Sequence, residues 1–255
     1  MTDQVVSQLI GVFLVFCRIG ACFMLLPGLS GDRITPQFRL FLALAISMAL
    51  AASLGDGVRK VASSQDSTLV LCVASEVLLG VALGFLVRIF YLAMEFAATA
   101  MANYAGYGSV FMQALSDDHS SGPFSEFLTL TSIALFFVLD LHVMIISMLY
   151  TSYTNWPVGE WVPAARFSTL MAHALQRAFL LTLQLSAPLL VYSLCVNASF
   201  GLISKVIPQI PIYLLSVPFV MAGGVFLVFQ TAPAIMSTFM EHVADWTGRL
   251  GSFGP

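Results

Sequence analysis

One stretch of the chain, from Thr68 to Tyr104, is almost entirely apolar, and it restricts the fold more than any motif does. As a single α-helix, at about 1.5 Å per residue, it would extend about 55 Å, whereas the hydrocarbon core of a bilayer is about 30 Å thick. Such a helix either breaks or leaves the membrane. Overall, 59% of the residues are hydrophobic and only 9% are charged, against about a quarter charged in soluble domains. We therefore predict an integral, multi-pass membrane protein.

Turn-forming and polar residues divide the apolar sequence into about six membrane segments. We expect α-helices arranged in hairpins, several of them kinked or broken, so the predicted fold is all-α and polytopic. The segments are residues 9–26, 40–54, 68–104, 124–153, 167–203 and 220–239. A single domain over residues 1–255 is expected, with a polar tail at residues 240–255. The second segment is shorter than the ~20 residues that a spanning helix needs.

Four prolines in the last third of the chain are expected to kink its helices, because proline lacks the N–H that the helix interior requires. They are Pro188, Pro208, Pro211 and Pro218. The last three fall within residues 207–218, and this stretch is therefore not expected to form one regular helix.

Seven ionisable residues interrupt the apolar segments, each costing about 2.5–3.5 kcal/mol if it stood alone at the centre of a membrane helix. They are Arg18, Glu76, Arg88, Glu95, Asp140, Arg177 and Lys205. Seven such groups cannot all face lipid. Either they form structural ion pairs or extend to the membrane surface from helix ends, or parts of these segments lie against protein partners. We predict protein partners for Glu76 and Arg88 in particular.

Small residues near Glu76 predict close helix packing. Gly80 and Gly84 form a GxxxG pattern, which lets two helix backbones approach each other. Glu76 lies one turn before Gly80 on the same helical face. Small residues are also common in membrane helices generally, so the pattern indicates packing without specifying the partner.

The central stretch from Ala105 to Pro123 differs from every other connection in the chain. Its glycines relax the backbone, and a short apolar group precedes a polar run. These residues are Gly106, Gly108, Val110, Phe111 and Met112. A loop exposed to water has little reason to carry Val-Phe-Met, so we expect the segment to be packed inside a structure. The simpler alternative is an ordinary loop whose Phe111 packs against its own helices.

Enzymatic, metal-binding and nucleic-acid functions have no support in the sequence. HExxH, GxSxG and GxxxxGK motifs do not occur, and the four histidines lack metal-ligand spacing. A net charge of -3 without a basic patch gives no footprint for nucleic acid. We expect neither catalysis nor a cofactor.

A secondary transporter is the main alternative among membrane proteins. Proline-interrupted helices with ionisable residues near mid-membrane form substrate and ion sites in transporters. The feature that would distinguish a transporter is an internal repeat, and the proline cluster has only a loose counterpart at Pro27 and Pro36.

The order and spacing of certain residues resemble the flagellar biosynthetic FliR family, which includes the related export-gate subunits of virulence type III secretion systems. The resemblance covers nearly the whole chain. It is carried by Arg18, Pro27, Arg33, Pro36, Arg39, Leu40, Ser75-Glu76, Gly80, Gly84, Ala187-Pro188, Asn197, Gly201, Pro208-Gln209 and Pro218.

This resemblance implies a subunit that assembles with FliP and FliQ into a helical, hetero-oligomeric export gate. Such a gate lies in the flagellar basal body, in the bacterial inner membrane, and unfolded export substrates leave the cytoplasm through it. The resemblance also implies association with FlhB and FlhA, and leaves a virulence export gate as the alternative. The mid-chain loop of the family helps to plug the closed pore, and by position that loop is Gly106 to Gly122 here. Apolar side chains such as Phe111 and Met112 suit this task, because hydrophobic constrictions exclude water.

Overall fold

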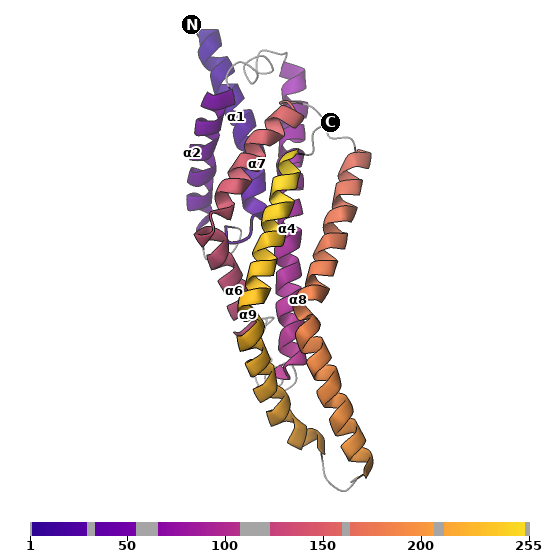
Figure 1. Cartoon of the computed structure of the whole chain (residues 1–255). Helices are drawn as coiled ribbons and strands as arrows, with labels where there is room; N and C mark the ends of the chain where they lie inside the picture. Colours follow the sequence, from indigo (N-terminus) through magenta and orange to yellow (C-terminus); the bar gives the residue numbers. More distant parts are fainter. Residues whose placement is uncertain are drawn as a thin grey trace. The chain divides into compact units, whose positions relative to one another are not determined.

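The computed structural model describes residues 2–29, 34–54, 66–107, 123–159, 164–206 and 212–252. Within these ranges every regular element is an α-helix (Figure 1). The helices are α1 (Thr2–Leu25), α2 (Pro36–Leu54), α4 (Asp66–Tyr104), α6 (Pro123–Val138), α7 (Leu141–Asn155), α8 (Ala164–Val206) and α9 (Ile212–Ser252). The prediction of an all-α polytopic protein is confirmed.

Five of the described helices, α1, α2, α4, α8 and α9, are long and apolar enough to cross a membrane. The pair α6 and α7 passes the same test as one broken span, which brings the number to six. Helices α4, α8 and α9 contain 39, 43 and 41 residues. At about 1.5 Å per residue each is roughly 58–65 Å long, about twice the ~30 Å thickness of the hydrocarbon core.

Helix α2 is longer than the apolar run on which its prediction rested. It begins at Pro36 and contains 19 residues. Proline is well suited to the first position of a helix, where its missing N–H would have no partner in any case. The extra turn contributed by residues 36–39 brings α2 to a length sufficient for a span.

The apolar run at residues 124–153, predicted as one of the kinked or broken membrane segments, is broken into two helices. Helix α6 ends at Val138 and α7 begins at Leu141. Between them Asp140 has φ 55° and ψ 22°, in the left-handed region. Its carbonyl accepts a hydrogen bond of 3.0 Å from the N–H of Val143. Asp140 therefore marks the break between two helices, and because a left-handed residue cannot continue a right-handed helix, the span is interrupted there.

The C-terminal end of the chain also differs from its prediction. Residues 241–252, expected to belong to a polar tail, form the last turns of α9. Val243, Trp246 and Leu250 are each only 2% exposed. Their spacing of three and four residues places them on one apolar stripe of the helix. Because the residues between them are polar or small, the composition of this segment alone predicted a polar tail.

Two of the four prolines named above lie inside continuous helices. Pro188 is within α8, and Pro218 is within α9, which also contains Pro233. Of the stretch 207–218, which was not expected to form one regular helix, residues 212–218 belong to α9, which begins at Ile212 and passes through Pro218. Pro208 and Pro211 lie outside the described residues. Membrane helices tolerate proline where neighbouring groups satisfy the freed carbonyl.

The chain divides into two compact units, which are described here separately. The first comprises the described residues within 1–90, 139–175 and 243–255. Its core contains residues of α1, α4, α7 and the end of α9, and α1 also packs against α2. In this core the rings of Phe90 and Trp246 lie 5.4 Å apart. Ala43 and Ser47 are the buried residues of α2.

The second unit comprises the described residues within 91–138 and 176–242. The ring of Tyr91 meets those of Phe136 and Phe239 edge-on, with centroids 5.6 and 5.4 Å apart. The hydroxyl of Thr182 donates a hydrogen bond of 3.1 Å to the carbonyl of Ala93, which joins α8 to α4. Contacts between α4, α6, α8 and α9 therefore form this core.

In this second unit, the end of α4 is closely packed where the chain enters the central stretch. Gly106 has φ 83°, and its N–H donates a hydrogen bond of 3.1 Å to the carbonyl of Asn103. Ala105 lies against Gly224 of α9, so closely that a Cβ on Gly224 would come within 2.7 Å of the Ala105 Cβ. The ring of Tyr107 stacks on that of Phe124, with centroids 5.8 Å apart. Both described edges of the central stretch are thus fixed by local contacts.

We expect Gly106→Ala to lower the free energy of unfolding by about 1–2 kcal/mol, because a residue with a Cβ is strained in the left-handed region. The added Cβ would also lie 3.1 Å from Cγ1 of Val220. Unfolding of the purified protein in detergent by increasing denaturant measures the effect. Gly201→Ala is the control, since a Cβ there meets nothing within 4 Å. Equal stability of the two variants would contradict the prediction.

Candidate functional site

The first unit contains a buried ion pair between two distant parts of the sequence. Arg18 lies on the face of α1 that also carries Leu14, Val15, Ile19 and Cys22, all fully buried. Its guanidinium Nε donates to Oε2 of Glu76 on α4 at 2.6 Å, and Nη2 donates to Oε1 at 2.9 Å. Both side chains are 0% exposed. This bidentate geometry is the strongest form of a charge-assisted hydrogen bond.

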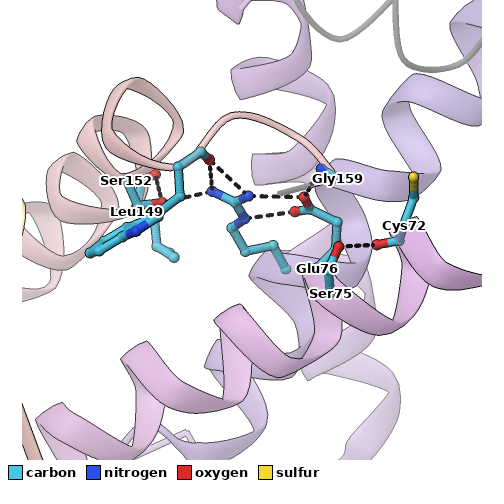
Figure 2. A network of polar contacts seen from close by, with 8 residues as sticks. Cys72, Ser75, Glu76, Leu149, Ser152 and Gly159 are labelled. Atoms are coloured by element: carbon cyan, nitrogen blue, oxygen red, sulfur yellow. Dashed lines mark hydrogen bonds and ion pairs between the residues drawn. The ribbon is translucent and has the colours of Figure 1, made fainter. Parts of the chain in front are cut away.

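The remaining guanidinium donors reach the end of α7 and the turn that follows it. Nη1 donates to Oγ of Ser152 and to the carbonyl of Trp156, each at 3.2 Å. Nη2 donates to the same Trp156 carbonyl at 3.1 Å. Arginine has five N–H donors, and all five are used here. Figure 2 shows Glu76 and Ser152 on opposite sides of the guanidinium, with dashed lines to both.

The carboxylate of Glu76 and the ring of Tyr153 complete the enclosure of the charge. Oε1 of Glu76 accepts a hydrogen bond of 3.0 Å from the N–H of Gly159, which Figure 2 shows above the carboxylate. The Arg18 Cζ lies 3.9 Å from the centroid of the Tyr153 ring, within cation–π range. We refer to Arg18, Glu76, Ser152, Tyr153 and the Trp156–Gly159 turn as the arginine cluster.

Two glycines explain how α1 and α4 approach closely enough to form the pair. A Cβ on Gly80 would overlap the carbonyl oxygen of Arg18 and lie 2.9 Å from the Cβ of Ala21. A Cβ on Gly84 would lie 2.8 Å from the carbonyl oxygen of Cys22. Gly80 is one turn beyond Glu76 on the same face of α4. The GxxxG pattern is therefore the surface of α4 that contacts α1.

The arginine cluster holds several helices of the first unit together. The guanidinium of Arg18 and the carboxylate of Glu76 are paired with each other and with the surrounding hydroxyl and backbone groups. The buried hydroxyl of Tyr153 has no hydrogen-bond partner among the described residues. The arginine cluster connects α1, α4, α7 and the turn after α7 through charge-assisted bonds that a low-dielectric surrounding strengthens. Among the described residues, no group of three or more His, Cys, Asp or Glu could hold a metal ion.

The structure separates the seven predicted charges into different environments. Only Arg18 and Glu76, among the described ones, form a buried ion pair. The prediction that Glu76 faces a protein partner is therefore wrong, because its partner is Arg18 of the same chain. Arg88 and Arg177 are half-buried, and Glu95, Asp140 and Lys205 are exposed. Asp140 lies 4.0 Å from His142, an exposed contact at the α6–α7 break.

Four of the five residues predicted to form a plug lie outside the described part of the chain. Gly106 is described, at the end of α4, but Gly108, Val110, Phe111 and Met112 lie outside the described residues. Their role remains a prediction.

Sequence reasoning missed the α7 half of the arginine cluster. Ser152 and Trp156 are 134 and 138 residues away from Arg18 along the chain, and no periodicity connects them. Trp156 and Pro157 have the composition of a turn at a membrane interface. Composition does not indicate that Arg18 binds the backbone carbonyl of Trp156. A small polar residue in an apolar helix, such as Ser152, was the available signal.

Comparisons with known proteins extend over nearly the entire sequence. The sequence profile of the family described as "Bacterial export proteins, family 1" matches residues 9–246. The flagellar biosynthetic protein FliR of Caulobacter vibrioides is 29% identical over 91% of this chain and 92% of its own length. FliR of Escherichia coli is 27% identical, with 95% and 91% covered. The Yop proteins translocation protein T of Yersinia pestis is 27% identical, with 86% and 84% covered.

Proposed function

Because the chain belongs to family 1 of the bacterial export proteins, we propose that it is a subunit of the flagellar type III protein export gate. In this proposal it assembles with FliP and FliQ, in contact with FlhB and FlhA, in the inner membrane at the flagellar basal body. Unfolded flagellar substrates leave the cytoplasm through the resulting pore. The match of the family profile to residues 9–246 is the observation that carries the proposal.

The helices of the chain have the properties expected of a subunit inside a larger assembly. Helices α4, α8 and α9 are about twice as long as the hydrocarbon core is thick, so lipid alone does not suit their whole length. Phe96, Phe179 and Phe229, one on each of these helices, are 65%, 62% and 78% exposed in the isolated chain. Exposed apolar surface of this kind is covered by lipid or by partner proteins.

The arginine cluster contributes to this function by fixing the first unit as a preformed building block. A subunit that must present a defined surface to its neighbours binds them more tightly when that surface is already ordered. The bidentate pair and the three backbone or hydroxyl contacts hold α1, α4 and α7 in one arrangement.

The direct test is co-expression of the chain with FliP and FliQ from the same organism, purification in mild detergent and native mass measurement. A stable particle that contains all three chains is expected. A monomer that binds a small solute would instead support a secondary transporter and would refute the gate assignment.

A virulence export gate is the second candidate, because the Yersinia relative matches 86% of this chain at nearly the same identity as the flagellar ones. Deletion of the gene separates the two functions. Loss of flagella and motility supports the flagellar gate, whereas intact motility with loss of effector secretion supports the virulence gate.

We further propose that the central stretch helps to close the idle pore. A conduit wide enough for an unfolded chain leaks ions unless apolar side chains meet across it and exclude water. Phe111 and Met112 have suitable side chains, and methionine adapts its shape readily. Support also comes from the edges of the stretch, where Gly106 and the Tyr107–Phe124 stack are packed in the second unit.

Deletion of residues 106–122, or Phe111→Gly, is expected to make the assembled gate permeable to small ions. Conductance of the purified complex in planar bilayers measures the leak, and the wild-type complex serves as the reference. A variant complex that assembles fully and stays as tight as wild type would remove the plug assignment while leaving the gate assignment intact.

A further inference from the structure

Arg88 is a cation in the middle of the longest apolar run of the chain, and none of the described residues is its partner. Within the described residues its guanidinium makes no hydrogen bond, ion pair or ring contact. The candidate span of α4 extends from Leu69 to Tyr104, so Arg88 lies 88 − 69 = 19 residues from one end and 104 − 88 = 16 from the other. A side chain this far inside an apolar helix has no nearby water to replace its missing bonds.

The contrast with Arg18 is informative, because both arginines belong to apolar helices of the same unit. All five N–H donors of Arg18 are used within the chain. Arg88 uses none of its five N–H donors with the described residues. Its side chain is half-buried, so one side of it is exposed. Ionisable residues in membrane segments nearly always pair with another group. The open side of Arg88 is therefore the place where that group must approach.

The surroundings of Arg88 on α4 form an exposed apolar face. Val81 and Phe85, seven and three residues earlier on the same face, are 41% and 38% exposed. Glu95, seven residues further along the same helical face, is an exposed carboxylate. Charge complementarity at Arg88 itself fits a carboxylate carried by an apolar partner helix, and a lipid phosphate is the alternative that the experiment below distinguishes.

We propose that the face of α4 around Val81, Phe85 and Arg88 docks a membrane helix of a partner subunit, which supplies an Asp or Glu carboxylate to Arg88. The inference rests on the proposed function, since it requires a partner chain. The planar guanidinium would bind this carboxylate in the bidentate manner seen for Arg18 and Glu76. The pair would form only on assembly, and the isolated subunit would carry its cation exposed.

The test compares Arg88→Glu, Arg88→Gln and Arg88→Lys with wild type, each co-expressed with the other gate subunits. Lys205→Gln is the matched control, because Lys205 is an exposed cation that also has no partner among the described residues. The fraction of the chain recovered in the purified complex is measured, together with the thermal stability of the chain expressed alone. Native mass spectra report any phospholipid that remains bound.

Recovery in the complex is expected to fall about tenfold or more for Arg88→Glu, because two buried like charges would face each other. A smaller fall is expected for Arg88→Gln, and partial retention for Arg88→Lys. The stability of the isolated variants should equal that of wild type. Restoration of the Arg88→Glu complex by replacing one acidic residue of a partner helix with lysine would identify the carboxylate.

Three results would overturn the inference alone: normal recovery of Arg88→Glu, loss of stability of the isolated variants, or an intact complex that has lost a bound phospholipid. The last result would assign a lipid phosphate to Arg88 instead of a carboxylate. Absence of any complex with the wild-type chain would instead refute the proposed function, and this inference with it.

Discussion

Replacement of Glu76 by glutamine should destabilise the protein by about 3–5 kcal/mol, the largest effect expected of any single conservative change in the first unit. The glutamine side chain keeps the shape of the glutamate but removes its charge. The guanidinium of Arg18, which is fully buried, would then remain as a cation without a counter-ion. Unfolding of the purified chain in detergent, followed by helical circular dichroism, measures the loss.

A double variant separates the cost of an unpaired charge from the value of the pair itself. Arg18→Met combined with Glu76→Gln removes both charges, and we expect it to be less destabilised than the sum of the two single variants. Part of the loss should persist, because the Trp156 carbonyl and the Gly159 N–H would each lose a charged partner. Strict additivity of the single effects would show that the two side chains do not act as a pair.

An exposed ion pair in the same unit provides the control for this experiment. Arg249 and Asp245 lie one turn apart on α9, with Nε and Oδ1 2.9 Å from each other. Their side chains are 52% and 47% exposed, so Arg249→Gln should change the stability by only about 0.3–0.5 kcal/mol. A loss at Arg249 as large as that at Glu76 would mean that burial is not the reason for the effect.

The second large effect is expected from Gly80→Ala, where one methyl group should cost about 3 kcal/mol, at the upper end of the usual range for overpacking. The added Cβ would overlap the backbone carbonyl of Arg18 and crowd the Cβ of Ala21. Neither atom belongs to a flexible side chain, so α1 and α4 must move apart. That movement would also stretch the bonds between Arg18 and Glu76.

Gly20→Ala tests whether the cost at Gly80 comes from the helix contact rather than from the loss of a glycine. Gly20 lies on α1, and a Cβ there would meet only the Phe16 ring at 3.8 Å, an ordinary contact. Because alanine favours helix over glycine by about 1 kcal/mol, this variant should be neutral or slightly stabilised. Thermal unfolding of both variants in the same detergent compares them directly, and a Gly80→Ala protein as stable as wild type would disprove the close approach.

The helical architecture could be predicted because it depends on the local pattern of the sequence. Apolar runs long enough to cross a bilayer must satisfy their own backbone hydrogen bonds, and a helix does so within the segment. The breaks were less predictable. Asp140 interrupts a span that is apolar on both sides, whereas Pro218 does not interrupt α9, so the residue type alone does not decide whether a helix continues.

The candidate site was predictable only as separate parts. Arg18 and Glu76 are recognisable as charges in apolar sequence, and Gly80 and Gly84 as a packing motif. The 58 residues that separate Arg18 from Glu76, however, correspond to no helical or strand period. At the α7 end, the cluster uses the Ser152 hydroxyl together with the Trp156 carbonyl and the Gly159 N–H. Nearly every residue type offers such backbone groups, so only the serine could have indicated this part of the cluster.

By itself, the sequence determined that this protein is a bundle of apolar helices and that its ionisable groups could not all face lipid, since both follow from the cost of polar groups in hydrocarbon. Only the tertiary structure decided which charge meets which. Close approach of α1 and α4 at Gly80 and Gly84 brings Arg18 to Glu76. Arg88, by contrast, meets no partner among the described residues. The physical reason is that an ion pair depends on distances of a few ångströms between helices, and these distances arise from packing, which sequence separation does not encode.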